Sequence, residues 1–255
     1  MMASSPMVQA LLFKGTIHMG NRFGYSTTAS QHPQSSVYAE DRSPLIQDDQ
    51  VKKVLRNTYA LLAMTLLFSA AVATAAVSFQ WKAPGLILTL VGFFGLLFAI
   101  HKLQNSGWAL PAVFALTGFM GYTLGPLLTH TLALPGGAQT VSLALGATGT
   151  TFIALSAYAL ISKRDLSFMG GFLFCGMVIA LLGGIAAIVF EIPALGLAIS
   201  AMVALLSAGL ILFETSRIVN GGESNYVLAT VSLYVTVFNL FSSLLTLFGI
   251  GGSND

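Results

Sequence analysis

Glu214 lies well inside a long apolar segment of this 255-residue sequence, and it is the first candidate for chemistry. Arg217 follows three residues later, on the same side of a helix. Two interpretations stay open. In one, Glu214 pairs with Arg217, whose long side chain reaches toward a membrane surface. In the other, Glu214 is a buried group whose protonation controls how two neighbouring helices pack.

A stripe of polar residues marks the last apolar segment, which covers residues 226–250. The stripe recurs at steps of four, three, four and three residues and therefore lies on one face of a helix. Its members are Ser232, Thr236, Asn239, Ser243 and Thr246. Such a face should point toward protein or water rather than lipid. It predicts either hydrogen bonding between helices or a hydrated path for ions, because both patterns look alike in one sequence.

Few other residues have types and spacings that favour chemistry. His101 flanks an apolar segment and His130 lies in a loop, and neither has Cys or carboxylate neighbours at metal-ligand spacing. Cys175 is the single cysteine, so no intrachain disulfide can form. The sequence contains no H-E-x-x-H, G-x-S-x-G or P-loop motif. We therefore expect no catalytic residue, no metal site and no cofactor, and we expect that the protein is not an enzyme.

The composition is that of a membrane protein. Hydrophobic residues make up 55% of the chain and charged residues 8%, whereas a soluble domain carries about 25% charged residues. A water-soluble fold with so few charges could not cover its surface. This balance excludes an ordinary soluble enzyme, a disordered chain and a nucleic-acid binder, and it makes the lipid bilayer the first partner.

Charged and loop-forming residues divide residues 54–255 into seven apolar segments. About 20 apolar residues span a bilayer as a helix, and helices satisfy their own backbone hydrogen bonds in lipid. The expected fold is an all-α membrane protein, a bundle of seven transmembrane helices. The predicted spans are residues 54–79, 85–101, 108–128, 139–161, 167–190, 194–219 and 226–250.

Small residues predict where the helices approach closely. Gly118, Gly121 and Gly125 recur at steps of three and four in the third predicted span. Helices in lipid associate through such bare stripes, because no side chain keeps the backbones apart. We therefore expect these three glycines to serve helix packing.

The tail and the loops predict the orientation. Residues 1–53 are polar and aperiodic, and we expect a flexible N-terminal tail that precedes a domain of residues 54–255. Basic residues favour the cytoplasmic side. If the N-terminus is cytoplasmic, Lys82 alone is outside. The cytoplasmic basic residues would then be those of the tail together with Lys52, Lys53, Arg56, Lys102, Lys163, Arg164 and Arg217. The N-terminus is therefore predicted in the cytoplasm and the C-terminus on the opposite side.

Several segments resemble the Bax inhibitor-1/YccA family, in its bacterial YccA branch. The resemblance runs from about residue 52 to the C-terminus, with matching motifs in most spans. The segments are VLRNTY at 54–59, PGLILTLVG at 84–92, TGFMGYTLGP at 117–126, ILFETS at 211–216, GGESNY at 221–226 and ATVSLY at 229–234.

The resemblance implies a seven-helix protein of the bacterial inner membrane, with a periplasmic C-terminus. It also implies a partner, the membrane-anchored AAA+ protease FtsH, with its membrane accessory proteins. FtsH pulls on cytoplasmic tails, and residues 1–53 would be such a tail. A tightly folded bundle that resists extraction would occupy the protease and inhibit it. Binding and modulation of FtsH is therefore the expected function.

The wider family implies an alternative, a pH-sensitive calcium or proton leak channel. In such relatives, carboxylates on the sixth and seventh helices share a proton. Glu214 matches the sixth-helix position, whereas the seventh-helix position is Thr236, which cannot share a proton in this way. The candidate switch residues are Glu214, Arg217, Thr236 and Asn239. Because half of the carboxylate pair is missing, we expect weak or absent pH-gated calcium flux.

Overall fold

A computed structural model of the protein describes residues 44–251, and these residues form seven long helices. The helices are α1 (Pro44–Ser78), α2 (Leu86–Leu103), α3 (Ala109–Leu132), α4 (Gly137–Ser162), α5 (Gly170–Val189), α6 (Pro193–Val219) and α7 (Tyr226–Gly251). One short 3-10 helix, η1 (Ser167–Met169), precedes α5. All seven are long and apolar enough to cross a bilayer. The predicted all-α, seven-helix fold is confirmed for the described residues.

The start of α1 differs from the prediction. We expected the tail to reach residue 53, but α1 begins at Pro44, so residues 44–53 are helical. Asp49 and Lys52 are exposed, and their charged atoms lie 3.8 Å apart, three residues apart on the helix. Six of these ten residues are Gln, Asp or Lys, so the apolar content that identifies a spanning helix in the sequence does not extend over them. The rest of the predicted tail, residues 1–43, lies outside the described residues.

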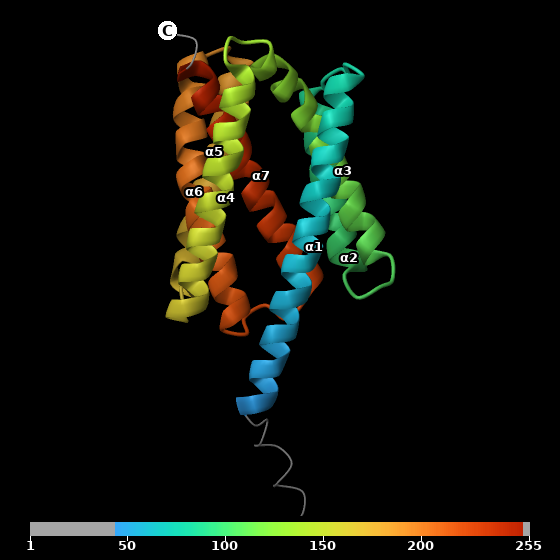
Figure 1. Cartoon of the computed structure of the whole chain (residues 1–255), viewed down its shortest axis with the longest axis vertical. Coiled ribbons are helices and arrows are strands. Elements are labelled where there is room, and N and C mark those ends of the chain that lie inside the picture. The colour runs from blue at the N-terminus through green and yellow to red at the C-terminus, as the bar shows by residue number, and fades with distance from the viewer. Residues whose placement is uncertain (1–43, 252–255) are drawn as a thin grey trace, which may run out of the picture. The chain divides into compact units, whose positions relative to one another are not determined.

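Tryptophan side chains mark the two ends of the bundle. Trp81 follows α1 and Trp108 precedes α3, and both side chains are exposed. Trp is enriched at membrane–water boundaries, so these positions fit the two surfaces of a bilayer. We call them the Trp81 end and the Trp108 end. Successive helices run antiparallel (Figure 1), so α1, α3, α5 and α7 all begin at the Trp108 end.

Helix α7 lies at the centre of the bundle. It contacts α1, α3, α4 and α6, and Figure 1 shows it passing between these helices. Its side chains Leu233, Tyr234 and Leu245 are fully buried. By contrast, α2 packs mainly against α3, and α5 packs mainly against α6. The two helices α2 and α5 therefore belong to the periphery.

The three glycines of α3 face α1. A Cβ atom added at Gly121 would overlap the Ser69 carbonyl oxygen, and one at Gly125 would lie 2.5 Å from Ala76 Cβ. A Cβ at Gly118 would lie 3.0 Å from the Phe68 ring. The backbones of α1 and α3 can be this close only because the glycines carry no side chain.

The hydroxyl of Tyr234 joins the three helices α1, α3 and α7. It donates a hydrogen bond to the Thr117 carbonyl oxygen of α3 at 3.2 Å. It also shares a 2.6 Å hydrogen bond with the Ser69 hydroxyl of α1. Ser69 belongs to the same turn of α1 that Gly121 contacts. We call the contact of Gly118, Gly121 and Gly125 with α1 the α1–α3 seam. This seam and the Tyr234 hydroxyl therefore hold the same part of α1 from two sides.

Candidate functional site

Glu214 and Thr236 meet across the interface of α6 and α7. The Thr236 hydroxyl donates to the Glu214 carboxylate, at 3.2 Å from Oε1 and 3.3 Å from Oε2. Thr236 is buried and Glu214 is partly buried. A hydroxyl placed between both carboxylate oxygens gives this acidic group a partner inside the bundle. The two positions that the family resemblance singles out are therefore neighbours in space.

Arg217 has a different partner. Its Nη2 atom lies 3.5 Å from Glu223 Oε2, and its guanidinium carbon lies 5.6 Å from the centre of the Phe213 ring. The ion pair ties the last turn of α6 to the loop that follows it. Among the described residues, Glu223 is the carboxylate within ion-pair distance of Arg217, and Glu214 lines the same small cavity as both.

A small cavity lies beside the carboxylate. Its lining includes Glu214, Arg217 and Glu223, together with Ser232 of α7, and its volume is about 10 Å³. This is roughly the space that the centre of one water molecule needs. The site can therefore hold about one water molecule next to Glu214, on the side that faces the Trp108 end.

The polar face of α7 does not have a single environment. Ser232 is exposed and lines the small cavity, whereas Asn239 lines a separate apolar groove between α2 and α5. The buried Thr236 lies between these two positions along the helix. Ser243 is buried, and the Thr246 hydroxyl donates to the Ser242 carbonyl oxygen at 2.9 Å within α7 itself. The five side chains recur at helical spacing in the sequence, but in the fold they lie in different surroundings.

Hydrogen bonds join the loops at the Trp108 end. The Ser216 hydroxyl donates to the Arg164 carbonyl oxygen at 2.7 Å and accepts from the Leu166 amide at 3.2 Å. The Asn220 amide group donates to the same Arg164 carbonyl oxygen at 3.2 Å. These bonds fix the connection between α4 and α5 against the end of α6. Gly221 then takes a left-handed conformation, with φ of 75°, where the chain turns toward α7.

Asn225 starts α7 and anchors it. Its Oδ1 atom accepts from the backbone amides of Val227 at 2.9 Å and Leu228 at 3.4 Å, as an N-terminal cap does. Its amide group lies 3.4 Å from Gln104 Oε1 and from Asn105 Oδ1, in the α2–α3 connection. One side chain therefore caps the central helix and holds it to a second loop.

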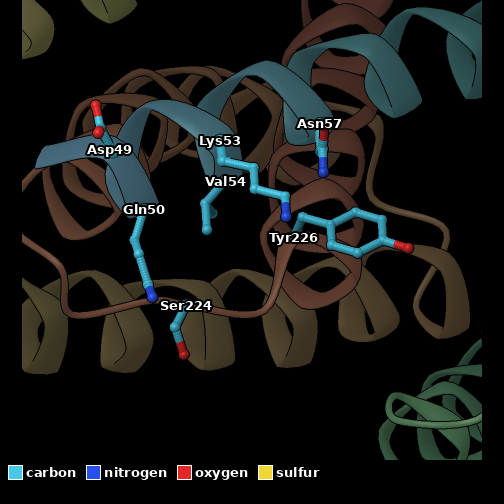
Figure 2. A pocket seen from close by; sticks show the side chains of 7 residues that line it. All are labelled: Asp49, Gln50, Lys53, Val54, Asn57, Ser224 and Tyr226. Atoms are coloured by element: carbon cyan, nitrogen blue, oxygen red, sulfur yellow. The ribbon is translucent and has the colours of Figure 1, made fainter. Parts of the chain in front are cut away.

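A crevice at the Trp108 end lies where the first turns of α1 pass the start of α7. Its volume is about 490 Å³. Figure 2 shows Gln50 pointing toward Ser224 and Lys53 pointing toward Tyr226. The remaining lining residues are Asp49, Val54 and Asn57, all from α1. Sequence reasoning missed this crevice, because its two walls are far apart in the chain and carry no shared motif.

An Asp in the α4–α5 connection is held in its ionised form. Asp165 Oδ1 accepts from the Ser167 backbone amide at 2.9 Å. Hydrogen bonds from the side chain and backbone of Ser167 lower the pKa of the Asp165 carboxyl below its usual value.

In the described part of the chain, no group of three or more His, Cys, Asp or Glu residues could hold a metal ion.

Comparison with known proteins identifies the relatives of this chain. The sequence profile of the family described as "Inhibitor of apoptosis-promoting Bax1" matches residues 51–253. The Escherichia coli K12 protein named "Modulator of FtsH protease YccA" is 49% identical over 211 residues, which cover 83% of this chain and 94% of that protein. A Pseudomonas aeruginosa protein is 46% identical over 88% of this chain and 98% of that protein. A Vibrio cholerae membrane protein is 44% identical over 81% of this chain and 93% of that protein.

Proposed function

This chain belongs to the Bax inhibitor-1 family, and from that premise we propose that it modulates the membrane-anchored protease FtsH. The observation that carries the proposal is the 49% identity to the Escherichia coli modulator of FtsH protease, of which it covers 94%. We propose that the chain acts as a substrate that FtsH engages through residues 1–53 but extracts poorly. While engaged, it occupies the protease and slows the degradation of other substrates.

The proposed location is the bacterial inner membrane, with the Trp108 end in the cytoplasm. Seven basic residues of the described part lie at this end, and Lys82 lies at the Trp81 end. The seven are Lys52, Lys53, Arg56, Lys102, Lys163, Arg164 and Arg217. Basic residues are retained on the cytoplasmic side. This charge difference supports a cytoplasmic N-terminus and a C-terminus on the periplasmic side, as an odd number of spans requires.

The packing of α1 supports resistance to extraction. A protease that pulls on the N-terminal segment transmits force to α1, the first helix that would leave the membrane. The close seam at Gly121 and Gly125 and the shared hydrogen bond of Tyr234 hold α1 against α3 and α7. Loss of α1 would leave the Tyr234 hydroxyl with one partner fewer in a site that water does not reach.

A cation or proton leak is the second candidate, because Glu214 lies within a span beside a cavity the size of one water molecule. Two features favour the protease modulator over the leak. The partner of Glu214 is the hydroxyl of Thr236 and not a second carboxylate. The cavity beside Ser232 and the groove beside Asn239 are separate.

A membrane pull-down tests the proposal. Tagged full-length protein is compared with a variant lacking residues 1–40 and with a third protein in which the same forty residues are scrambled. Captured membranes are probed for FtsH and for its membrane accessory proteins. Capture by the full-length and scrambled proteins, lost in the deletion, is the expected result. If none of the three proteins captures FtsH, the result favours the leak. Calcium flux into liposomes, compared between the wild type and Glu214→Gln, would then test the leak directly.

A further inference from the structure

A large apolar groove lies between the two peripheral helices, α2 and α5, with α6 and α7 as its floor. Its volume is about 720 Å³. One wall is the first half of α2, from Leu86 to Phe94, and the other is the stretch of α5 from Phe174 to Ile188. Asn239 and Ser242 supply the polar atoms of the floor that belong to α7. This groove is distinct from the small cavity beside Glu214.

The groove lies inside the hydrocarbon region and reaches toward the Trp81 end of the bundle. Its α2 wall is the half of α2 nearer to this end, whereas its α5 wall covers most of the length of α5. Fourteen residues separate Phe174 from Ile188, which corresponds to about 21 Å along a helix. One leaflet of the hydrocarbon core is about 15 Å thick. The groove is therefore long enough to follow a chain through one leaflet.

The lining favours a flexible chain over a transmembrane helix. Helix interfaces in lipid rely on small residues, as the α1–α3 seam does. Here the walls carry large side chains, such as Phe94 and Phe174, and both are more than half exposed. The volume lies within the roughly 300–1,000 Å³ of pockets that hold small ligands. Water is a poor occupant, because most of the lining offers no hydrogen-bond partner.

We propose that the groove binds an acyl chain of a bilayer phospholipid, which bridges α2 to α5. Because the groove lies between two helices long and apolar enough to cross a bilayer, lipid is the molecule that can reach its open side. Since lipid tails are as apolar as Leu, the gain comes from van der Waals contact with protein on three sides. Helix α2 packs mainly against α3, so the bound chain supplies the contact that α2 lacks on the side of α5.

Photo-cross-linking in nanodiscs tests this site. The full-length protein is reconstituted with a phospholipid that carries a diazirine in one acyl chain, and labelled peptides are mapped by mass spectrometry. Labelling of the α2 and α5 walls should exceed labelling at Ile153 of α4, a lipid-facing residue outside the groove that is 68% exposed. Labelling of the walls no higher than at Ile153 would overturn the proposal.

Glycine variants give the specificity control. A Cβ at Gly184, in the groove, would meet only Ile199 at 3.9 Å, so Gly184→Phe can place a ring in the groove. Gly171 of the same helix has nothing within 4 Å and does not line the groove. Gly184→Phe should lose the excess labelling and Gly171→Phe should keep it. Leu181→Trp, at a second lining position, provides the same test if Gly184→Phe does not fold.

The identity of the occupant is tested separately. Native mass spectrometry of the protein released from nanodiscs should show a retained phospholipid, with reduced occupancy in Gly184→Phe. Asn239→Leu should retain the lipid, because an acyl chain needs no polar group. Loss of the ligand in Asn239→Leu, retention of a molecule other than a phospholipid, or cross-linking of the walls to another protein helix would contradict the proposal.

Discussion

The substitution Gly121→Ala should break the contact on which α1 depends. The new methyl group would overlap the Ser69 carbonyl oxygen, which belongs to the rigid backbone of α1 and cannot rotate away. It would also lie 2.9 Å from Ser69 Oγ. To restore contacts of about 3.5 Å, the two helices must separate by roughly 1 Å. A shift of α1 also moves Ser69 relative to Tyr234 of α7 and so weakens the 2.6 Å hydrogen bond between their hydroxyls.

The expected loss of stability follows from these two effects. Overpacking of a close interface costs about 1–3 kcal/mol, and a hydrogen bond between membrane helices contributes about 0.6 kcal/mol. Gly121→Ala should therefore lower the free energy of unfolding by roughly 1.5–3.5 kcal/mol. Gly146→Ala is the matched control, because Gly146 of α4 has nothing within 4 Å of its Cβ position. This control should be neutral, or stabilising by up to about 1 kcal/mol.

The assay is equilibrium unfolding in mixed detergent micelles, followed by circular dichroism for both variants and the wild type. A free energy of unfolding for Gly121→Ala equal to that of Gly146→Ala would refute the reasoning. It would mean that α1 and α3 can separate without cost, so the seam would not explain resistance to extraction.

Three further predictions concern single side chains. Tyr234→Phe should lower the free energy of unfolding by about 1 kcal/mol, because two interhelical hydrogen bonds are lost; the same detergent titration measures it, and an unchanged value would contradict the network. Thr236→Val should destabilise by about 1 kcal/mol or more, since Glu214 loses its hydroxyl donor, whereas Thr236→Ser should keep most of the stability. Asp165→Ala should be less stable than the wild type at neutral pH. Because the folded pKa of Asp165 is lowered, this difference should be full above its usual value of 3.8 and vanish as the pH falls through the folded pKa; a difference that persists in acid would refute it.

The fold could be predicted from the sequence because composition and spacing determine it directly. Seven apolar segments separated by charges specify seven spanning helices. The spacing of Gly118, Gly121 and Gly125 indicated a close interface, although it did not say that α1 was the partner. The start of α1 was missed because six of residues 44–53 are Gln, Asp or Lys, so the continuous apolar character of a spanning helix does not extend over them.

The site was predictable only in part. The family resemblance placed Glu214 and Thr236 at matching positions, and the structure brings them within hydrogen-bond distance. The partner of Arg217 was not predictable from helical spacing, because Glu223 reaches it from a loop. The crevice of Figure 2 and the groove between α2 and α5 arise from residues distant in the chain, so no local pattern could have revealed them.

The most direct test of the proposed function is an activity assay of FtsH in liposomes. The degradation rate of a second membrane substrate is measured with the full-length protein, with the variant lacking residues 1–40, and with Gly121→Ala. The proposal predicts that the full-length protein slows degradation, that the deletion variant does not, and that Gly121→Ala is itself degraded faster and inhibits less. Equal inhibition by the full-length protein and the deletion variant, or no inhibition by either, would contradict it.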